Sequence, residues 1–369
     1  MRITDVVLTL FAWKGIPAVT YGAHTSASAG ESRLGLVEIR TDQGITGHAF
    51  LGSATIPADA EATMLIRWLK PLVMGENPLD REKLVARLWT RIRQATPRAI
   101  GAVDVALWDL AGKALGVPVH RLLGTYRDAI PAYASSAILP SPEAYAEEAL
   151  RYKEAGWAAY KIHPPQRMEA DIAACRAVRR AVGDDYRIML DSTWAYDFPT
   201  ALRVGKVAEA LGFYWYEDPL ADQDLYNYVK LRQLLRIPIM ATEYPLGGLD
   251  GYAQWIMNRA TDYLRGDVAV KGGITTVYKT AHLAQAFRMN YEIHHGGNSL
   301  NNFANLHLAM AIPNTEFFEV LLPAEAQKYG IVDDIEIGSD GMVRAPDRPG
   351  LGAQIDFDLI KRMTVAVLS

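Results

Sequence analysis

The chain has 369 residues, of which 50% are hydrophobic, and its 38 basic and 42 acidic residues give a net charge of −4 at pH 7. The length predicts one large domain plus a smaller one, and the absence of a Lys or Arg run argues against nucleic acid or an anionic membrane as partner. The single cysteine, Cys175, excludes a disulfide within the chain. We find no signal peptide and no apolar run of the ~18 residues that span a bilayer, so we expect a cytoplasmic protein.

The first segment is predicted to form an antiparallel meander. Residues 34–40 and 45–50 have strand character and flank Thr41-Asp-Gln-Gly44, whose glycine supplies the positive φ of a hairpin turn. Before this hairpin, residues 21–30 are rich in Gly, Ser and Ala. Loops of this kind often close over ligands, and a plain surface loop fits the composition equally well.

Residues 57–124 have helical character. In residues 99–115, apolar side chains recur with the 3.6-residue period of one helix face, and Gly116 followed by Pro118 ends the helix. Asp104 and Asp109 lie on other faces of this helix. We therefore expect structural roles for both aspartates.

From about residue 128 the chain repeats strand and helix units. Three short apolar runs each end in an acid, at residues 187–191, 213–217 and 238–243, and the acids are evenly spaced because 217 − 191 = 26 and 243 − 217 = 26. Such runs predict strands that are buried on both faces, and each is followed by an amphipathic stretch long enough for a helix. Repeated strand–helix units of this period predict a closed parallel barrel.

Further strands at the same period complete the predicted barrel. They are expected at residues 130–135, 158–163, 263–270, 290–295 and 316–320. After the eighth strand, the pattern returns to short strands and turns. We expect this tail to pack against the N-terminal region.

The three strand-end acids, Asp191, Glu217 and Glu243, are predicted to form a metal site. The C-terminal ends of barrel strands meet at the mouth, where active sites lie, so the carboxylates should converge there and need a cation. A set of hard oxygen ligands fits Mg²⁺. An acid at a strand end also serves as a helix cap, but three at equal spacing on consecutive units favour the metal.

Two further groups at the mouth are candidates for acid and base chemistry. Lys161 and His163 are two residues apart on a strand, so both side chains should point inward. Across the barrel, Asp267 and His295 are expected to pair, the carboxylate fixing the tautomer of the imidazole and raising its basicity. A basic imidazole beside a metal-chelated carboxylate removes an α proton, and the metal stabilises the resulting enediolate.

Each of these assignments has an alternative. Only one ring of the doublet His294-His295 points inward, and we prefer His295 because two glycines follow it and allow a ligand to approach closely. Lys161 serves equally well as a counter-ion for the acids. Glu319 in the eighth strand is a candidate donor of a hydrogen bond or a proton, and a simple cap of a turn is the alternative.

Taken together, these residues resemble the enolase superfamily and, within it, the mandelate racemase subgroup, over nearly the whole chain. The resemblance implies an α/β fold, a modified (β/α)₇β TIM barrel with an α+β capping domain formed by the N-terminal region and the C-terminal tail. It also implies one Mg²⁺ with the substrate carboxylate bound to it, and a homo-oligomer between dimer and octamer. We expect the capping domain at residues 1–125, the barrel at 126–322 and the completing segment at 323–369. The motifs that carry the resemblance are the helix 99–116, Leu190-Asp191, Tyr216-Glu-Asp-Pro219, Ala241-Thr-Glu243, Asp267-Val-Ala-Val-Lys-Gly-Gly273, the seventh-strand His and Glu319.

The resemblance also assigns the loop from Tyr21 to Ser28 to closure of the site and substrate choice. Two departures from the subgroup pattern matter. The second strand carries Lys161-Ile-His163 instead of Lys-x-Lys, which puts two-base racemisation in doubt, and the third carries Asp191-Ser-Thr193 instead of Asp-x-Asn, which alters a polar contact to the substrate. The candidate substrate contacts are Tyr21, His24, Thr193 and His294.

Most members with the Asp/His dyad that are not racemases resemble acid sugar dehydratases, so we expect a Mg²⁺-dependent dehydratase of an aldonate or aldarate. His295 would take the α proton, and the same residue or His163 would help the β-hydroxyl leave, giving a 2-keto-3-deoxy sugar acid. The alternatives are a racemase or epimerase of a 2-hydroxy or sugar acid, and a catalytically silent ligand-binding barrel. A diacid would need a cation far from the metal, for which the candidates are Arg33, Lys14 and Lys271.

Overall fold

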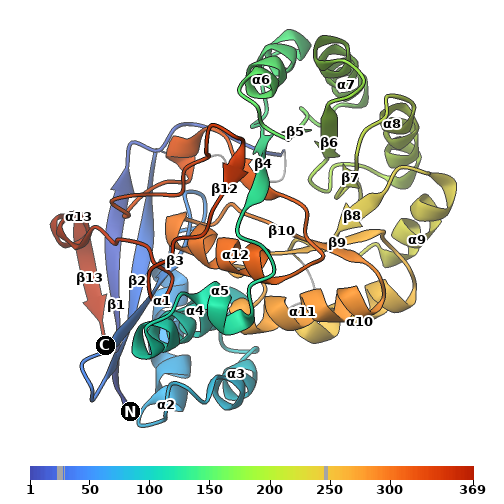
Figure 1. The fold of residues 1–369 in the computed structure, drawn as a ribbon. Coiled ribbons are helices and arrows are strands. Elements are labelled where there is room, and N and C mark those ends of the chain that lie inside the picture. Colours follow the sequence, from blue (N-terminus) through green and yellow to red (C-terminus); the bar gives the residue numbers. More distant parts are fainter. Residues whose placement is uncertain (23–27, 29, 245–247) are drawn as a thin grey trace.

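The computed structural model describes residues 1–22, 28, 30–244 and 248–369, and Figure 1 shows two parts, a sheet on the left and a barrel on the right. In the described chain the sheet has four antiparallel strands in the order β13-β1-β2-β3. The predicted hairpin is confirmed, with Gly44 at φ 73° in its turn. The strands are β1 (Ile3–Lys14), β2 (Glu31–Thr41), β3 (Thr46–Leu51) and β13 (Thr364–Leu368).

Helices follow the sheet, as the periodicity predicts, and α4 is the longest of those in the described chain. It begins after Thr96, whose hydroxyl accepts a hydrogen bond from the backbone of Ala99 at 3.2 Å, and it ends at Gly116, where φ is 70°. Such a cap and a left-handed glycine mark the two ends of many helices. The helices are α1 (Asp59–Met64), η1 (Leu65–Leu69), α2 (Lys70–Val73), α3 (Arg81–Trp89), α4 (Pro97–Leu115) and α5 (Val119–Leu123).

The barrel consists, within the described residues, of eight parallel strands paired in the order β10-β9-β8-β7-β6-β5-β4-β11. Because all eight strands run parallel, their C-terminal ends lie at the same mouth of the barrel. The short strand β12 (Met342–Val343) pairs antiparallel with β4. The eight strands are β4 (Ile130–Ser135), β5 (Ala159–Ile162), β6 (Arg187–Asp191), β7 (Tyr216–Glu217), β8 (Ile239–Ala241), β9 (Tyr263–Gly266), β10 (Asn290–Ile293) and β11 (Phe318–Leu321).

One helix follows each strand from β4 to β10, which gives seven strand–helix units and a final strand in the described chain. The predicted (β/α)₇β fold class is therefore confirmed. Figure 1 shows these helices on the outside of the strands. They are α6 (Pro142–Glu154), α7 (Met168–Val182), α8 (Phe198–Ala210), α9 (Leu225–Leu234), α10 (Leu249–Met257), α11 (Ile274–Ala286) and α12 (Ser299–Ala311).

Two buried aspartates of α4 connect the parts. Asp104 accepts hydrogen bonds from the backbone and hydroxyl of Thr275 at 2.8 and 2.6 Å, which joins α4 to the start of α11. Asp109 accepts from the backbone of His48 and of Leu351, both at 2.8 Å. The structural roles expected for both residues agree with these contacts. Together with the pairing of β13 with β1, they fix the C-terminal tail on the N-terminal sheet, as predicted.

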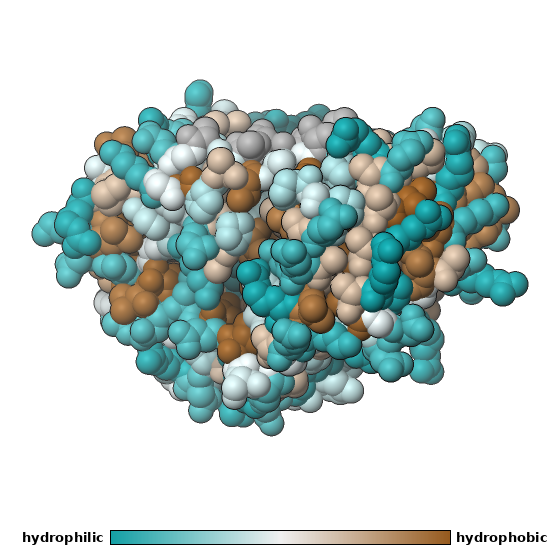
Figure 2. All heavy atoms as spheres, turned by 90° about the horizontal axis from the view of Figure 1, so that it is seen from above, coloured by the Kyte–Doolittle hydropathy of each residue, from teal (hydrophilic) through white to brown (hydrophobic). Residues whose placement is uncertain are grey.

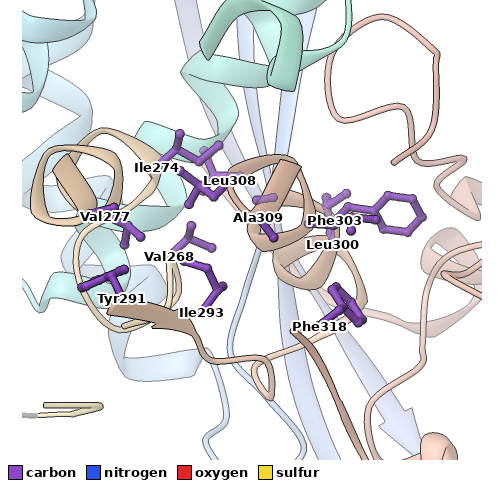
Figure 3. Packing of buried hydrophobic residues seen from close by; sticks show 14 of the residues in the cluster. Val268, Ile274, Val277, Tyr291, Ile293, Leu300, Phe303, Leu308, Ala309 and Phe318 are labelled. Carbon is purple, nitrogen blue, oxygen red and sulfur yellow. The ribbon is translucent and has the colours of Figure 1, made fainter. Parts of the chain in front are cut away.

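The core of the barrel has an inner and an outer part. Inside, Trp215 packs edge-on against Tyr133, with ring centroids 5.8 Å apart, as part of a small apolar cluster, and its Nε1 donates to Glu217 Oε2 at 2.9 Å. Outside, the strands pack against their helices. Figure 3 shows Tyr291 and Ile293 of β10 pointing to the side chains of α11 and α12.

Two details differ from the expected elements. The strand predicted over residues 263–270 ends at Gly266, because the carbonyl of Asp267 accepts from the backbone of Val270 and Lys271 in a turn. The tail contains η2 (Ala324–Ala326) and α13 (Phe357–Met363), whereas only short strands and turns are predicted there. The domain boundaries at residues 125 and 322 stay predictions.

Figure 2 shows one face of the molecule, on which hydrophobic side chains lie in several separate patches among hydrophilic ones. Within the described chain, none of the helices combines the length and the apolar character that crossing a bilayer requires.

Candidate active site

The three predicted metal acids converge. Asp191 ends β6, Glu217 ends β7, and Glu243 lies two residues beyond β8. All three are buried, and one carboxylate oxygen from each lies within 4.8 Å of the others. Equal spacing in sequence therefore becomes a cluster in space, because successive parallel strands end at the same mouth.

Two buried cations lie beside this acid triad (Asp191, Glu217 and Glu243). Nζ of Lys161 is 3.0 Å from both Asp191 Oδ2 and Glu217 Oε2. Nε of Arg265 is 2.6 Å from Glu217 Oε1. These ion pairs reduce the repulsion among the carboxylates.

The triad has the donor chemistry of a magnesium site. Its ligand atoms are all carboxylate oxygens, which Mg²⁺ prefers, and three protein ligands leave positions for water and substrate oxygens in an octahedral shell. Two positive charges do not neutralise all the nearby acids, since Glu319 also contacts both Lys161 and Arg265. The residues present therefore fit a divalent cation.

Lys161 is completely buried, and its ammonium group contacts three carboxylates, with Glu319 Oε1 the nearest at 2.7 Å. Burial opposes the charged form, but Glu217 and Glu319 outweigh burial and the neighbouring Arg265, and the pKa of Lys161 lies well above its usual value. This arrangement fits the alternative in which Lys161 is a counter-ion of the acids, and its role in acid and base chemistry stays a prediction.

His163 directly follows β5 and points to the triad. Its Nδ1 donates to the carbonyl of Ser136 at 2.7 Å, and its Nε2 lies 3.0 Å from Asp191 Oδ2. Lys161 and His163 thus meet the same carboxylate oxygen, as expected for residues two apart on one strand. The carbonyl of Ser136 fixes the ring so that Nε2 is the atom presented to the site.

The Asp/His pair forms with the other histidine of the doublet. Nδ1 of His294 is 2.8 Å from Asp267 Oδ2, and its Nε2 is 3.2 Å from Glu243 Oε1. The preference for His295 is therefore corrected. Side chains alternate along a strand, so His294 lies on the same side as Glu292 inside the barrel, and His295 lies on the side of Ile293.

His295 is buried away from the triad. Its ring packs on Phe318, with centroids 3.9 Å apart, and neither ring nitrogen has a hydrogen-bond partner among the described residues. Burial lowers the pKa of this imidazole to about 3. Among the described residues, those that line the cavity above the triad do not include His295.

Glu319 accepts rather than donates. Besides Lys161, the guanidinium of Arg265 donates to its Oε2, and the backbone of His295 donates to the same oxygen at 3.3 Å. Burial raises its pKa, but Arg265 and Lys161 outweigh burial and hold the pKa of Glu319 well below its usual range. The predicted donation of a hydrogen bond or proton by Glu319 to a substrate stays a prediction.

The pKa of His294 responds to its two acids. Burial lowers it, but Glu243 and Asp267 outweigh burial and raise the pKa to about 9. A divalent cation bound by Glu243 opposes that rise, because the charge of a bound ion dominates its surroundings. Asn305 donates to Asp267 Oδ1 at 2.9 Å and to the carbonyl of His294 at 3.0 Å, which holds the pair in place.

A cavity of about 250 Å³ opens above the triad and is lined by Asp191, Glu243, His163 and His294. Of the predicted substrate contacts, Tyr21 and Thr193 also line it. The hydroxyl of Tyr21 donates to the carbonyl of Leu322 at 2.9 Å, which fixes its ring over the site. His24 lies outside the described residues.

Several residues of the site were not anticipated. Arg265 follows the inward alternation of β9, so that pattern carried a signal for it. Trp194 and Tyr244 line the cavity, with ring centroids 5.4 Å apart. Asn305 lies in the apolar sequence of α12 and carried no signal.

The chain matches two family descriptions that together span most of its length. Residues 8–124 match "Mandelate racemase / muconate lactonizing enzyme, N-terminal domain", and residues 144–359 match "Enolase C-terminal domain-like".

Relatives with assigned activities match over most of their own lengths. The chain is 30% identical to an arabinonate dehydratase of Saccharolobus solfataricus, over 86% of this chain and 87% of that protein. It is 31% identical to an L-talarate/galactarate dehydratase of Salmonella typhimurium, over 86% and 79%. A solved structure of D-glucarate dehydratase from Agrobacterium tumefaciens, complexed with magnesium, superposes with a TM-score of 0.88 at 35% identity, over 99% of this chain and 100% of that one.

Proposed function

Since the chain belongs to the mandelate racemase / muconate lactonizing enzyme family of the enolase superfamily and is a hydro-lyase of that superfamily, we propose that it dehydrates a sugar acid with the help of Mg²⁺. The product is a 2-keto-3-deoxy sugar acid. The observation that carries the proposal is the placement of two imidazoles at the two ends of the acid triad, His163 against Asp191 and His294 against Glu243, on one cavity.

Asp191, Glu217 and Glu243 are the proposed ligands of Mg²⁺. When bound, the cation supplies Lewis acidity to the carboxylate of the substrate, which makes the α proton more acidic and stabilises the enediolate charge. The magnesium in the solved D-glucarate dehydratase structure supports this choice of metal.

His294 is the proposed base. Asp267 accepts from its Nδ1, so the lone pair belongs to Nε2, which faces the cavity and takes the α proton. Asp267 then stabilises the imidazolium. Asn305 acts as a positioning residue, because it holds Asp267 and the backbone of His294 without reaching the cavity.

His163 is the proposed acid. With Nδ1 held by the carbonyl of Ser136, a proton on Nε2 points to the cavity and is delivered to the β-hydroxyl as the C–O bond breaks. The electron pair of the α C–H bond becomes the new C=C bond, water leaves, and the enol tautomerises to the ketone. Lys161, Arg265 and Glu319 keep the buried charges balanced beneath the ligands.

A racemase or epimerase is the second candidate, and the same pair of imidazoles supports it. If His163 acted as a second base, a proton removed on one side would be returned on the other, with Lys161 left as counter-ion. The catalytically silent barrel is less well supported, because the triad and the Asp267–His294 pair are both assembled.

The test is a screen of aldonates and aldarates with Mg²⁺ that measures keto acid by semicarbazide and α-deuterium incorporation by NMR. Keto acid that is absent with His294→Asn supports the proposed dehydratase. Deuterium at the α carbon without keto acid supports the racemase. If neither signal appears with any acid, the proposed function is wrong. The cytoplasmic location and the homo-oligomeric state stay predictions.

A further inference from the structure

We infer that the substrate is a monocarboxylate, an aldonate with a neutral far end, and not an aldarate. The inference rests on the proposed function and names its substrate class. Relatives named for both kinds of acid match the chain, so similarity alone does not choose between them. The choice follows from the walls of the cavity.

The cavity has an acidic floor and an uncharged roof. The barrel contributes the carboxylates and the two imidazoles, whereas the described residues contributed by the N-terminal segment are all uncharged, and Val19, Ala54 and Ile56 among them are apolar. Leu321, the last residue of β11, and Ala326, which follows that strand, extend this apolar wall. A metal bound at the acidic side of the cavity would neutralise one carboxylate of the substrate. A second one would lie against the uncharged walls.

Burying an ionised carboxylate without a cation is costly, whereas a hydroxyl group needs only neutral partners. The cavity offers such partners in the side chains of Thr55, Tyr21 and Gln327. Gln327 donates to the Tyr21 hydroxyl at 3.3 Å, so these two groups form a connected neutral edge. This edge suits the terminal hydroxyl of an aldonate.

The cations expected for a diacid are held elsewhere. Arg33 pairs with Asp59 at the surface, Lys14 is exposed at the end of β1, and Lys271 is buried with its ammonium 5.2 Å from the ring of Tyr252. None of the three lines the cavity over the part of the chain that the structure describes. Residues 23–27, 29 and 245–247 contain no Lys or Arg in the sequence, and His24 is the one side chain among them that can carry a positive charge.

In the described chain, Arg98 is the strongest remaining candidate for a cation that would bind a second carboxylate of the substrate. It lines an adjoining cavity of about 40 Å³, which shares Ile56, Tyr244 and His294 with the main cavity. Its guanidinium lies over the ring of Tyr244, 5.8 Å from the centroid, with Nη1 3.9 Å from Glu61 Oε1. The ring of Tyr244 borders both cavities, so Arg98 lies behind it. The main cavity is also small, since sites for drug-sized ligands begin at ~300 Å³. A short acid with one charge fits it.

The experiment compares matched pairs of acids that differ only at the far end, such as gluconate with glucarate and galactonate with galactarate, each with Mg²⁺. We expect kcat/KM for the productive aldonate to exceed that for its aldarate by at least ~10-fold, about the effect of leaving one charge unpaired. An aldarate that reacts as well as or better than its aldonate overturns the inference. Calorimetric binding of the same pairs decides it even if no acid reacts, in which case only the proposed dehydration fails.

Two variants test the wall itself. Ile56→Arg places a cation beside the cavity, and Ile56→Gln is the matched neutral control. We expect the ratio of aldarate to aldonate binding to rise at least ~10-fold in Ile56→Arg relative to Ile56→Gln. If the ratio of aldarate to aldonate binding does not change in Ile56→Arg, the uncharged wall does not set selectivity. The same conclusion follows if the wild type prefers aldarates and Arg98→Gln removes that preference.

Discussion

Nδ1 of His294 lies 2.8 Å from Oδ2 of Asp267, while the next imidazole in the chain, His295, is buried on the other side of the strand. Two adjacent histidines thus have opposite environments. One shares a carboxylate and borders the cavity. The other packs on Phe318.

This difference predicts opposite results for the two asparagine variants. His294→Asn should reduce keto acid formation by ~10³-fold or more, because general base catalysis contributes ~10²–10⁴-fold and no other group replaces it. His295→Asn should change it less than ~10-fold. The rates of keto acid formation by both variants are measured, and unfolding curves check that each variant is folded. Equal losses of rate in the two variants would contradict the assignment of His294 as the base.

His163→Asn should separate proton removal from elimination. With His294 intact, the variant should still exchange the α proton for deuterium at a rate within ~10-fold of the wild type. Its keto acid formation should fall by ~10²-fold or more, since the leaving hydroxyl lacks its proton donor. NMR of the substrate and the semicarbazide assay measure the two rates. A parallel loss of exchange would assign a different role to His163.

Asn305→Leu should lower kcat by about 10- to 100-fold, which is the usual effect of removing a group that orients a functional residue. The variant removes the donor to Asp267 Oδ1 but no group that lines the main cavity. The pH profile of kcat should move as well, because Asp267 sets the basicity of His294. Asn302→Leu on the same helix is the control, and a shift of equal size there would indicate a general effect on α12.

Removal of the metal should abolish activity, and added Mg²⁺ should restore it. Saturating Mg²⁺ should also raise the unfolding temperature by a few degrees, because a ligand at 100 times its Kd stabilises the folded state by about 2.7 kcal/mol. Glu243→Gln should lose this response, whereas the exposed Glu336→Gln should keep it. A thermal response retained by Glu243→Gln would exclude the proposed ligand set.

Glu292→Gln should flatten the dependence of stability on pH. Burial, followed by the nearby Glu316 carboxylate, raises the pKa of Glu292 from 4.5 to about 8. Above pH 4.5 the unfolded chain loses this proton while the folded protein keeps it, so the free energy of unfolding falls as the pH rises towards 8. The variant lacks this loss.

Chemical denaturation at pH 5 and at pH 8 measures the effect of Glu292→Gln. At pH 8 the variant should be more stable than the wild type by a few kcal/mol, since one pKa unit corresponds to about 1.36 kcal/mol. The exposed Glu336→Gln serves as the control. If the free energy of unfolding fell equally between pH 5 and pH 8 in the wild type and in Glu292→Gln, the role of Glu292 would be refuted.

The barrel and the triad were predictable because they follow from local patterns. Short apolar runs at a constant period specify buried parallel strands, and an acid at the end of each run lies at the mouth. The orientation of the histidine doublet was predictable too, since Tyr291 and Ile293 are apolar and face the helices. The preference for His295 rested on the two glycines that follow it, and it was wrong. Glycines allow a ligand to approach the backbone closely, but they do not determine on which side of the strand a neighbouring side chain lies.

Other parts of the site have no local pattern. Asn305 reaches Asp267 across 38 residues of sequence, and its helix is apolar on most sides, so only the packed structure shows the contact. The carbonyl of Ser136, the residue that follows the neighbouring strand β4, holds His163, and backbone groups carry no residue-specific signal. The uncharged roof of the cavity depends on a long-range fold of the N-terminal segment over the barrel.

The hydroxyl of Tyr21 donates to the carbonyl of Leu322, which is 301 residues later in the chain, and strand β1 pairs with β13 at the far end of the sequence. During translation the first strands therefore leave the ribosome long before their partners exist. Barrel units close to one another in sequence form contacts sooner. The contact that holds Tyr21 over the cavity therefore forms only after Leu322 has been made, so the N-terminal segment cannot complete the wall of the cavity before the barrel strands have been synthesised.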